Sequence, residues 1–391
     1  MQNFVFHNPT KIIFGKDNIP IIGSETAAFG QNALLVYGGG SIKKNTIYDQ
    51  VTKSLTDAGI IITEHSGVQS NPVLSHVHKG IALAKENRID VIVAVGGGSV
   101  LDSAKAIAAG TLVEHDVWKF FIGKKSIKGA LPITCVLTLA ASGSEMNSGM
   151  VVTNEKTKQK FGFANKHLYP RGSILDPTAT FTVSPAYTAY GAVDAIAHVL
   201  EYYFTSREPY TPVQDHFMEG LVISCMDSCN RVLKNRKDYD ARADLMWAAT
   251  LALNGLTGSG LGKVGFPMHM IEHSLSALYN VAHGAGLSVV IPGWMRYQSQ
   301  QTPEKFAQFA ERIFGISSGG TEKKAAAGIQ ALLSWFISIK TPTSLKDLRI
   351  SEQDIPMIAD NAQALAKIWG MKDYDKEKIG DVLKLCMKGR A

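Results

Sequence analysis

The chain has 391 residues, of which 45% are hydrophobic and 19% charged, and its formal net charge at pH 7 is +6. This composition excludes a disordered chain, and the length favours two domains over one. The basic residues occur in pairs such as Lys43 and Lys44. A nucleic-acid-binding surface needs a concentrated basic stripe, so we expect no nucleic-acid partner.

The N-terminal residues, MQNFVFHNPTK, lack the cationic segment and apolar core of a signal peptide. No apolar run approaches the roughly 20 residues that span a bilayer. The cysteines form no CxxC pair, and we expect them to be buried, reduced thiols. We therefore expect a cytoplasmic protein without a membrane partner. The cysteines are Cys135, Cys225, Cys229 and Cys386.

The first part of the chain alternates strand and helix patterns. The run ALLVY begins at residue 33, and a helical segment follows to about residue 58. IIITEH then leads into a helical pattern, HVHKGIALAKEN, and into the apolar run DVIVAV. This alternation indicates βαβ units and a parallel sheet. We predict a Rossmann-like α/β dinucleotide-binding domain over residues 1–180.

Two glycine-rich turns follow two of these strand patterns, at residues 38–41 and 96–99. The second should lie at the carboxyl end of a strand, where open α/β sheets bind ligands. Its glycines leave room for a phosphate, and the helix expected from about Ser99 directs unpaired N–H groups toward it. The pattern predicts a pyrophosphate site. The alternative is a tight turn that uses glycine only for positive φ. Neither copy matches GxGxxG, because Lys43 and Leu101 occupy the place of the third glycine.

The first glycine turn indicates which nucleotide binds. A site for the adenosine ribose of NAD usually carries a carboxylate. Here Gly39, Gly40 and Ser41 are followed by Lys43. This small, neutral-to-basic lining leaves room for a 2′-phosphate and supplies donors to it. We therefore predict NADP(H) rather than NAD(H). Glu64, at the end of the next strand pattern, is the residue that could overturn this prediction.

After about residue 176 the pattern becomes helical throughout. Ser184 and Pro185 form an N-cap followed by proline at the first helical position. We predict an all-helical second domain over residues 181–391, in which Pro292 interrupts a helix or marks its end. The predicted helices include 185–204, 212–234, 240–256, 267–279 and 284–300.

Five polar side chains in this helical part form a candidate metal site. Asp194 and His198 are four residues apart, which places them on one helix face. His269, His273 and His283 lie within fifteen residues of one another. Polar groups on apolar helices cost free energy unless they are paired, and a carboxylate with several imidazoles suits Zn2+ or Fe2+. The spacing alone does not decide which histidines bind.

A second interpretation is a zinc metallopeptidase. Residues 269–273 read HMIEH, which matches the HxxEH pattern of two histidine ligands and a glutamate base. This interpretation leaves Asp194, His198, His283 and both glycine turns without a role. We therefore favour a redox enzyme.

The motifs taken together resemble the iron-containing alcohol dehydrogenases, in particular the branch of butanol dehydrogenases and NADPH-dependent aldehyde reductases. The resemblance covers nearly the whole chain and implies an active site in the cleft between the two domains. It is carried by YGGGSIKKN, AVGGGSVLDSAKAIA, LTLAASGSEMNSG, DAIAH and HMIEHSLSALYNVAHGAGLSVVIP.

The resemblance also implies roles for individual residues. Asp194, His198, His269 and His283 would hold one divalent cation, Fe2+ or Zn2+, and His273 would be a catalytic residue near the nicotinamide. Members that use NAD tend to have aspartate where Gly39 stands. The implied cofactor residues are Gly39, Gly40 and Ser41 at the adenosine end, Gly97, Gly98, Ser99 and Asp102 at the pyrophosphate and nicotinamide, and Asn71, Thr138, Ser142, Asn147 and Lys160 along the same cleft.

The implied reaction is hydride transfer between NADP(H) and a small primary alcohol or its aldehyde, carried out by a homodimer. The alternative function within this fold is that of an NAD-dependent polyol dehydrogenase. Such enzymes have altered metal ligands, so the complete set of one aspartate and three histidines speaks against it.

Overall fold

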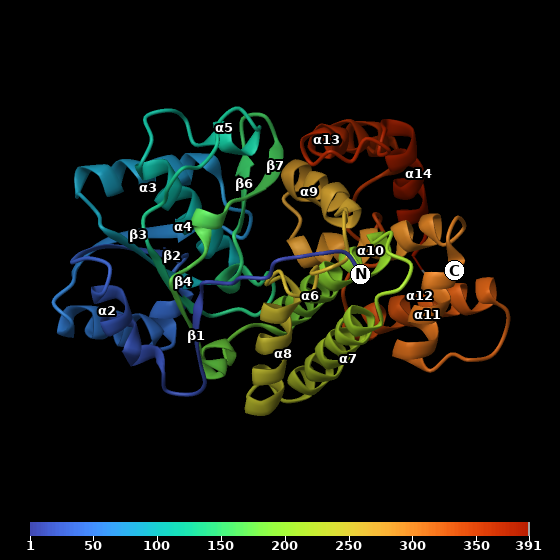
Figure 1. Cartoon of the computed structure of the whole chain (residues 1–391), viewed down its shortest axis with the longest axis horizontal. Helices are drawn as coiled ribbons and strands as arrows, with labels where there is room; N and C mark the ends of the chain where they lie inside the picture. Colours follow the sequence, from blue (N-terminus) through green and yellow to red (C-terminus); the bar gives the residue numbers. More distant parts are fainter. Residues whose placement is uncertain (390–391) are drawn as a thin grey trace. The chain divides into compact units, whose positions relative to one another are not determined.

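The computed structural model describes residues 1–389, which form two compact units (Figure 1). The α/β unit comprises His7–Ser184 and Asn235–Gly255, and the helical unit comprises Met1–Phe6, Pro185–Lys234 and the chain from Leu256 onward. The ranges expected from sequence, 1–180 and 181–391, differ from these units mainly in residues 1–6 and 235–255.

Helix α8 (Tyr239–Ala252) explains the second difference. Its Trp247 packs edge-on against Phe14 with 5.9 Å between ring centroids, and Thr250 donates a hydrogen bond to Glu145 over 2.5 Å. Both partners belong to the α/β unit. The helix predicted over 240–256 is present but ends at Ala252, and its packing partners lie more than 100 residues away in sequence.

The α/β unit is built on a six-stranded parallel sheet with the strand order β1-β8-β5-β4-β2-β3. Every residue of β4 is buried, as expected for a central strand covered on both faces. Val51 and Leu55 of α2 belong to one apolar cluster with Leu35 and Val93 of the sheet. The predicted parallel α/β sheet is confirmed. The strands are β1 (Lys11–Phe14), β2 (Asn32–Gly38), β3 (Ile61–Val68), β4 (Val91–Gly96), β5 (Ile133–Leu137) and β8 (Gly172–Leu175).

Helices and a hairpin complete this unit. The hairpin of β6 (Gly149–Asn154) and β7 (Gln159–Ala164) is antiparallel and was not predicted from the sequence. It carries Phe161, whose ring stacks on Trp118 at 5.5 Å. The helices are α1 (Ile22–Ala27), α2 (Ile47–Asp57), α3 (Leu74–Glu86), α4 (Gly98–Thr111) and α5 (Trp118–Phe121).

The helical unit matches the helix predictions closely. Four of its helices, α6, α7, α9 and α11, begin at a proline, where the missing N–H costs nothing. Helix α10 continues through Pro292, because α6, α9 and α14 pack around it. Within residues 1–389 no helix has the length and apolarity of a bilayer span. The helices are α6 (Pro185–Thr205), α7 (Pro212–Lys234), α9 (Pro267–Tyr279), α10 (His283–Gln298), α11 (Pro303–Phe314), α12 (Thr321–Ser338), α13 (Ile355–Ile368) and α14 (Lys376–Cys386).

Candidate active site

Three predicted metal-binding imidazoles face one oxygen of the fourth candidate ligand, Asp194, in the helical unit. Ligand atoms of Asp194, His198 and His269 lie within 4.8 Å of one another. Asp194 and His198 lie on α6, His269 lies on α9, and His283 is the first residue of α10. The Nε2 atoms of His198 and His269 each lie 3.7 Å from Asp194 Oδ1. The Nε2 atom of His283 lies 3.5 Å from the same oxygen. The structure thus brings together residues that are up to 89 positions apart in sequence.

These separations fit a bound cation. Ligand atoms at roughly 2.0–2.2 Å from a tetrahedrally coordinated metal lie about 3.4 Å from one another. Asp194 Oδ1 and His269 Nε2 are buried and have no hydrogen-bond partner. Buried polar atoms without partners are rare in native proteins, and one divalent cation would satisfy both. The donor set of one carboxylate and three imidazoles suits Zn2+ or Fe2+.

Two buried glutamates orient two of the imidazoles. His269 donates from Nδ1 to Glu201 Oε1 over 3.0 Å, and its backbone N–H donates to the same oxygen over 2.8 Å. His283 donates from Nδ1 to Glu272, which also accepts from Ser276 Oγ. Both glutamates are 0% exposed. Because Nδ1 of each ring donates to a glutamate, Nε2 is the nitrogen left to bind a cation beside Asp194.

Sequence reasoning missed Glu201. The signal was present, because Glu201 stands three residues after His198 in the otherwise apolar run AIAHVLEYYF. A single charge on the buried face of such a helix requires a partner.

The titratable groups of the cluster shift one another's pKa values. Burial alone would raise the pKa of Asp194, but the imidazoles of His198, His283 and His269 together lower it below its usual range. Burial lowers the pKa of His198 to about 3, which keeps this ring neutral. The carboxylates of Asp194 and Glu201 outweigh burial and raise the pKa of His269 to about 9. A cation held at His269 Nε2 would therefore have to displace a proton from this ring.

Glu272 does not occupy the position that the peptidase interpretation requires. Its carboxylate already accepts from His283 and Ser276. Glu272, His273 and His283 do bring three ligand-type atoms within 4.8 Å. The buried ring of His273 lies 5.5 Å from that of His283 and packs edge-on against Trp369. Glu272 is thus placed to orient the His283 ring.

We expect Glu201→Gln to weaken metal binding by about 10- to 100-fold, because an amide orients and polarises His269 less well than a carboxylate. Chelator competition measures the dissociation constant directly. The matched control is Glu219→Gln, because Glu219 is also a buried glutamate of the helical unit but binds Tyr203 and Arg312. If Glu201→Gln binds metal as tightly as the control variant, Glu201 has no orienting role.

The second glycine turn has the predicted strand–turn–helix arrangement. β4 ends at Gly96 and α4 begins at Gly98. None of the three glycines has positive φ, which contradicts the alternative that glycine serves only that purpose. A Cβ on Gly96 would lie 2.4 Å from Val100 Cγ2, and one on Gly98 would lie 2.2 Å from Ser142 Oγ. Glycine is required here because neighbouring atoms approach closely.

Most of the residues predicted for the dinucleotide lie around this turn. Ser99 Oγ donates to Ser70 O over 2.5 Å, and Thr138 N donates to Gly96 O over 3.0 Å. Lys160 on β7 donates to Asn71 Oδ1 over 3.0 Å. Asp102 is partly committed elsewhere, because its two oxygens accept from Ser144 Oγ and Val151 N. Contact between these residues and a dinucleotide stays a prediction.

The first glycine turn differs from the second. Gly40 has φ of 98°, a left-handed conformation that favours glycine. Gly39 is exposed, and a Cβ there would meet no atom within 4 Å. Gly39 therefore leaves open space next to Ser41 and Lys43.

Glu64 is engaged by its neighbours. Its carboxylate accepts hydrogen bonds of 2.5 Å from Tyr37 and from Tyr48, and it lies 3.5 Å from Lys43 Nζ. The hydrogen bonds from Tyr37 and Tyr48 lower the pKa of Glu64. Lys43 Nζ also lies 4.2 Å from the ring centre of Tyr48. Glu64, which could have bound the adenosine ribose of NAD, thus pairs with Lys43 next to the first glycine turn.

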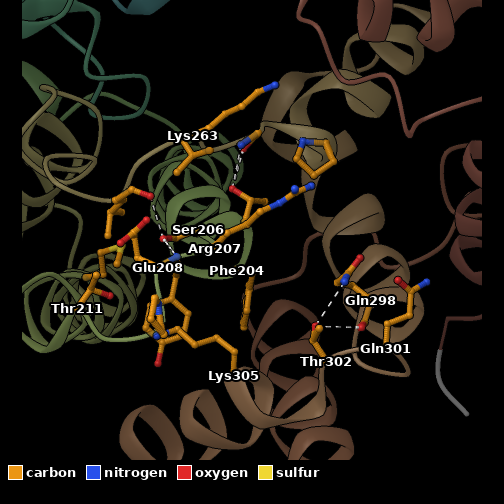
Figure 2. A pocket seen from close by; sticks show the side chains of 18 of the residues that line it. Phe204, Ser206, Arg207, Glu208, Thr211, Lys263, Gln298, Gln301, Thr302 and Lys305 are labelled. Atoms are coloured by element: carbon orange, nitrogen blue, oxygen red, sulfur yellow. Dashed lines mark hydrogen bonds between the residues drawn. The ribbon is translucent and has the colours of Figure 1, made fainter. Parts of the chain in front are cut away.

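A separate cavity of about 750 Å³ lies in the helical unit and was not predicted from sequence. Figure 2 shows part of its lining, including Ser206, Glu208 and Lys305. None of the four metal-ligand candidates lines it. Two of its basic side chains are neutralised, because Lys305 pairs with Asp215 and Arg312 with Glu219. We therefore assign this cavity no ligand.

Comparisons with known proteins agree with this arrangement. The family model "Iron-containing alcohol dehydrogenase" matches residues 9–177, and "Fe-containing alcohol dehydrogenase family, C-terminal" matches residues 188–388. The probable NADH-dependent butanol dehydrogenase 1 of Bacillus subtilis is 42% identical, covering 98% of this chain and 99% of its own. The NADPH-dependent aldehyde reductase YqhD of Escherichia coli is 37% identical, covering 92% of each.

A solved structure is similar over almost the full length. The crystal structure of NADH-dependent butanol dehydrogenase A from Thermotoga maritima superimposes with a TM-score of 0.94 at 47% identity, covering 99% of both chains. The family expected from the sequence motifs is thereby confirmed. The chain belongs to the iron-containing alcohol dehydrogenase family.

Proposed function

We propose that the protein transfers a hydride between NADP(H) and a small primary alcohol or its aldehyde, with one divalent cation, Fe2+ or Zn2+, held by the aspartate and three histidines. The observation that carries this proposal is the convergence of three imidazole Nε2 atoms on one oxygen of Asp194. Membership of the family supports alcohol and aldehyde oxidoreduction as the reaction class.

When bound, the cation supplies Lewis-acid stabilisation of the substrate oxygen, and the dinucleotide supplies or accepts the hydride. The chain's own residues prepare for this chemistry. Asp194 contributes the single negative charge of the ligand set, so that a divalent cation keeps net positive charge for the substrate oxygen. Glu201 and Glu272 hold two imidazoles in fixed tautomers. His273 lies beside His283, where it can donate or accept a proton.

We expect His273→Ala to keep its metal while kcat falls by about 100-fold, because a general acid or base typically contributes this much. Metal content per chain and kcat should be measured on the same sample. His216→Ala is the control, because His216 is a histidine of the helical unit whose side chain is 68% exposed. Loss of metal from His273→Ala would place His273 among the metal ligands. An unchanged kcat would show that His273 contributes only to packing.

The choice of NADP(H) rests on this chain's own residues, because the relatives' names include both NADH- and NADPH-dependent enzymes. Three features support it: the open space at Gly39, the exposed Lys43, and the engagement of Glu64 by two tyrosines. The open space admits a 2′-phosphate, and Lys43, whose ion pair with Glu64 is 3.5 Å long and exposed, can donate to it.

A homodimer and a cytoplasmic location are part of the proposal. Phe4 and Val5, near the N-terminus, are 52% and 95% exposed, and adjacent exposed apolar side chains are typical of an interface. The four cysteines are all free and buried, which suits a reducing compartment.

The experiment that tests the proposal is a screen of aliphatic and aromatic aldehydes, which follows NADPH absorbance with the metal-loaded protein. Metal should be determined on the same sample. We expect oxidation of NADPH with small aldehydes and one metal ion per chain. A metal-loaded protein that oxidises NADPH with none of them would contradict the proposed reaction.

A further inference from the structure

A fully buried lysine in the α/β unit has no part in the chemistry described above. Lys105 lies on α4, two turns after the second glycine turn, and it is 0% exposed. Its Nζ lies 2.7 to 3.2 Å from five oxygens, all from residues 144–149. These oxygens are three backbone carbonyls, the hydroxyl of Ser144 and the amide oxygen of Asn147. We call them the oxygen cage.

The oxygen cage surrounds a charge rather than forming five separate hydrogen bonds. An ammonium has only three N–H groups, so five oxygens cannot each receive their own hydrogen. Rings of neutral carbonyl oxygens replace the water shell of K+ in ion channels in a similar way. A buried cation is costly unless it is compensated so completely. Burial lowers the pKa of Lys105 to about 8, so the side chain remains charged at neutral pH.

A carboxylate completes the arrangement. Ser144 Oγ accepts from Lys105 Nζ at 2.9 Å and donates to Asp102 Oδ1 at 2.7 Å. Asp102 and Lys105 are three residues apart on α4, which places them on the same helix face. Asp102 also accepts from the backbone N–H of Val151 over 3.0 Å. Two residues of α4 thus tie down the segment that leads into the β6–β7 hairpin.

This segment carries residues of the predicted dinucleotide site. Asn147 donates from its amide nitrogen to Ser142 O over 3.3 Å, while its amide oxygen accepts from Lys105. Ser142 in turn lies so close to Gly98 that no Cβ fits there. Lys105 therefore connects, through Asn147 and Ser142, to the turn expected to receive the pyrophosphate.

We propose that Lys105 is a positioning residue, an internal cation that fixes residues 142–149 against α4 and so shapes one wall of the dinucleotide site without touching the dinucleotide or the substrate. The identity of the dinucleotide rests on the proposed function, whereas the oxygen cage does not. One consequence is specific to this role. If the ammonium is removed, the cage should accept a small monovalent cation in its place.

The test compares Lys105→Ala, which empties the cage, with Lys105→Met, which fills it with an uncharged chain of similar length. Hydrogen exchange of residues 142–149 is measured in the unliganded protein, and the NADPH dissociation constant by fluorescence. Each variant is studied in ammonium, potassium and tetramethylammonium chloride at equal ionic strength. Lys105→Ala should exchange faster and bind NADPH at least about tenfold more weakly. Ammonium or potassium should reverse both changes, tetramethylammonium should reverse neither, and no ion should restore Lys105→Met.

Two results would overturn the proposal. One is that either variant shows the hydrogen exchange and the NADPH affinity of the wild-type protein. The other is that Lys105→Ala folds but neither ammonium nor potassium restores its hydrogen exchange and NADPH affinity. If Lys105→Ala folds only in ammonium or potassium buffers, the proposal is supported.

If Lys105→Ala folds in no buffer, Ser144→Ala decides, because this substitution removes one cage oxygen and the link to Asp102. In Ser144→Ala the hydrogens of residues 142–149 should exchange faster, and NADPH should bind several-fold more weakly. Wild-type values for both would contradict the proposal. A wild-type protein that does not bind NADPH contradicts the proposed function instead, while the exchange measurement still tests the cage.

Discussion

Replacement of His269 by alanine should abolish bound metal and reduce kcat by at least about 1,000-fold. His269 contributes one of the four converging ligand atoms, and its ring stacks on that of His198 with 4.6 Å between centroids. Its removal also leaves the buried carboxylate of Glu201 without its imidazole partner. The measurement is metal content per purified chain, together with the rate of NADPH oxidation.

The comparison with His216→Ala separates this effect from a general loss of stability, because His216 belongs to the same unit but is exposed and pairs with Glu219. Folding should be checked by thermal unfolding of both variants in chelator. A His269→Ala protein that retains one metal ion and full activity would remove His269 from the site.

The second large effect concerns the choice of nucleotide. Gly39→Asp should lower kcat/KM for NADPH by about 100-fold and raise it for NADH, because the new carboxylate would repel a 2′-phosphate and accept from a ribose hydroxyl. The substitution is sterically free, since a Cβ at Gly39 meets no atom within 4 Å and its φ is not positive. The measurement is kcat/KM for both nucleotides with the same aldehyde.

Gly39→Asn is the matched control, because asparagine has nearly the size of aspartate without its charge. It should retain a preference for NADPH. If both variants behave alike, the effect is steric and the electrostatic argument for the first glycine turn is wrong. A wild-type protein with a clear preference for NADH would reject the 2′-phosphate pocket outright.

Much of the fold was accessible from the sequence because its local signals are strong. The apolar run DVIVAV can only be a buried strand or part of a buried helix, and the glycines after it favour the strand, β4. Ser184 and Pro185 located the start of α6, and helical periodicity located α7 and α9 within a residue or two. The β6–β7 hairpin was missed because its strands, GMVVTN and QKFGFA, alternate only weakly between apolar and polar residues.

The remaining differences arise from contacts between distant residues. Nothing local in α8 indicates that Trp247 packs on Phe14 or that Thr250 binds Glu145. Helix α10 continues through Pro292 because neighbouring helices stabilise it, which outweighs the local preference of proline.

The candidate site shows the same division. Spacing identified Asp194 and His198 as neighbours on one helix face, and the histidines of α9 and α10 as candidates. It could not separate His273 from the ligands, because His269 and His273 share a helix face. Only the packing of α6 against α9 and α10 shows which Nε2 atoms meet Asp194.

Anomalous diffraction at the absorption edge of the bound metal, from crystals loaded with Fe2+ or Zn2+, tests the central claim most directly. We expect a single peak in each chain, within bonding distance of Asp194 Oδ1 and of the Nε2 atoms of His198, His269 and His283. A peak coordinated instead by Glu272 and His273, or no peak among those four atoms, would contradict the account.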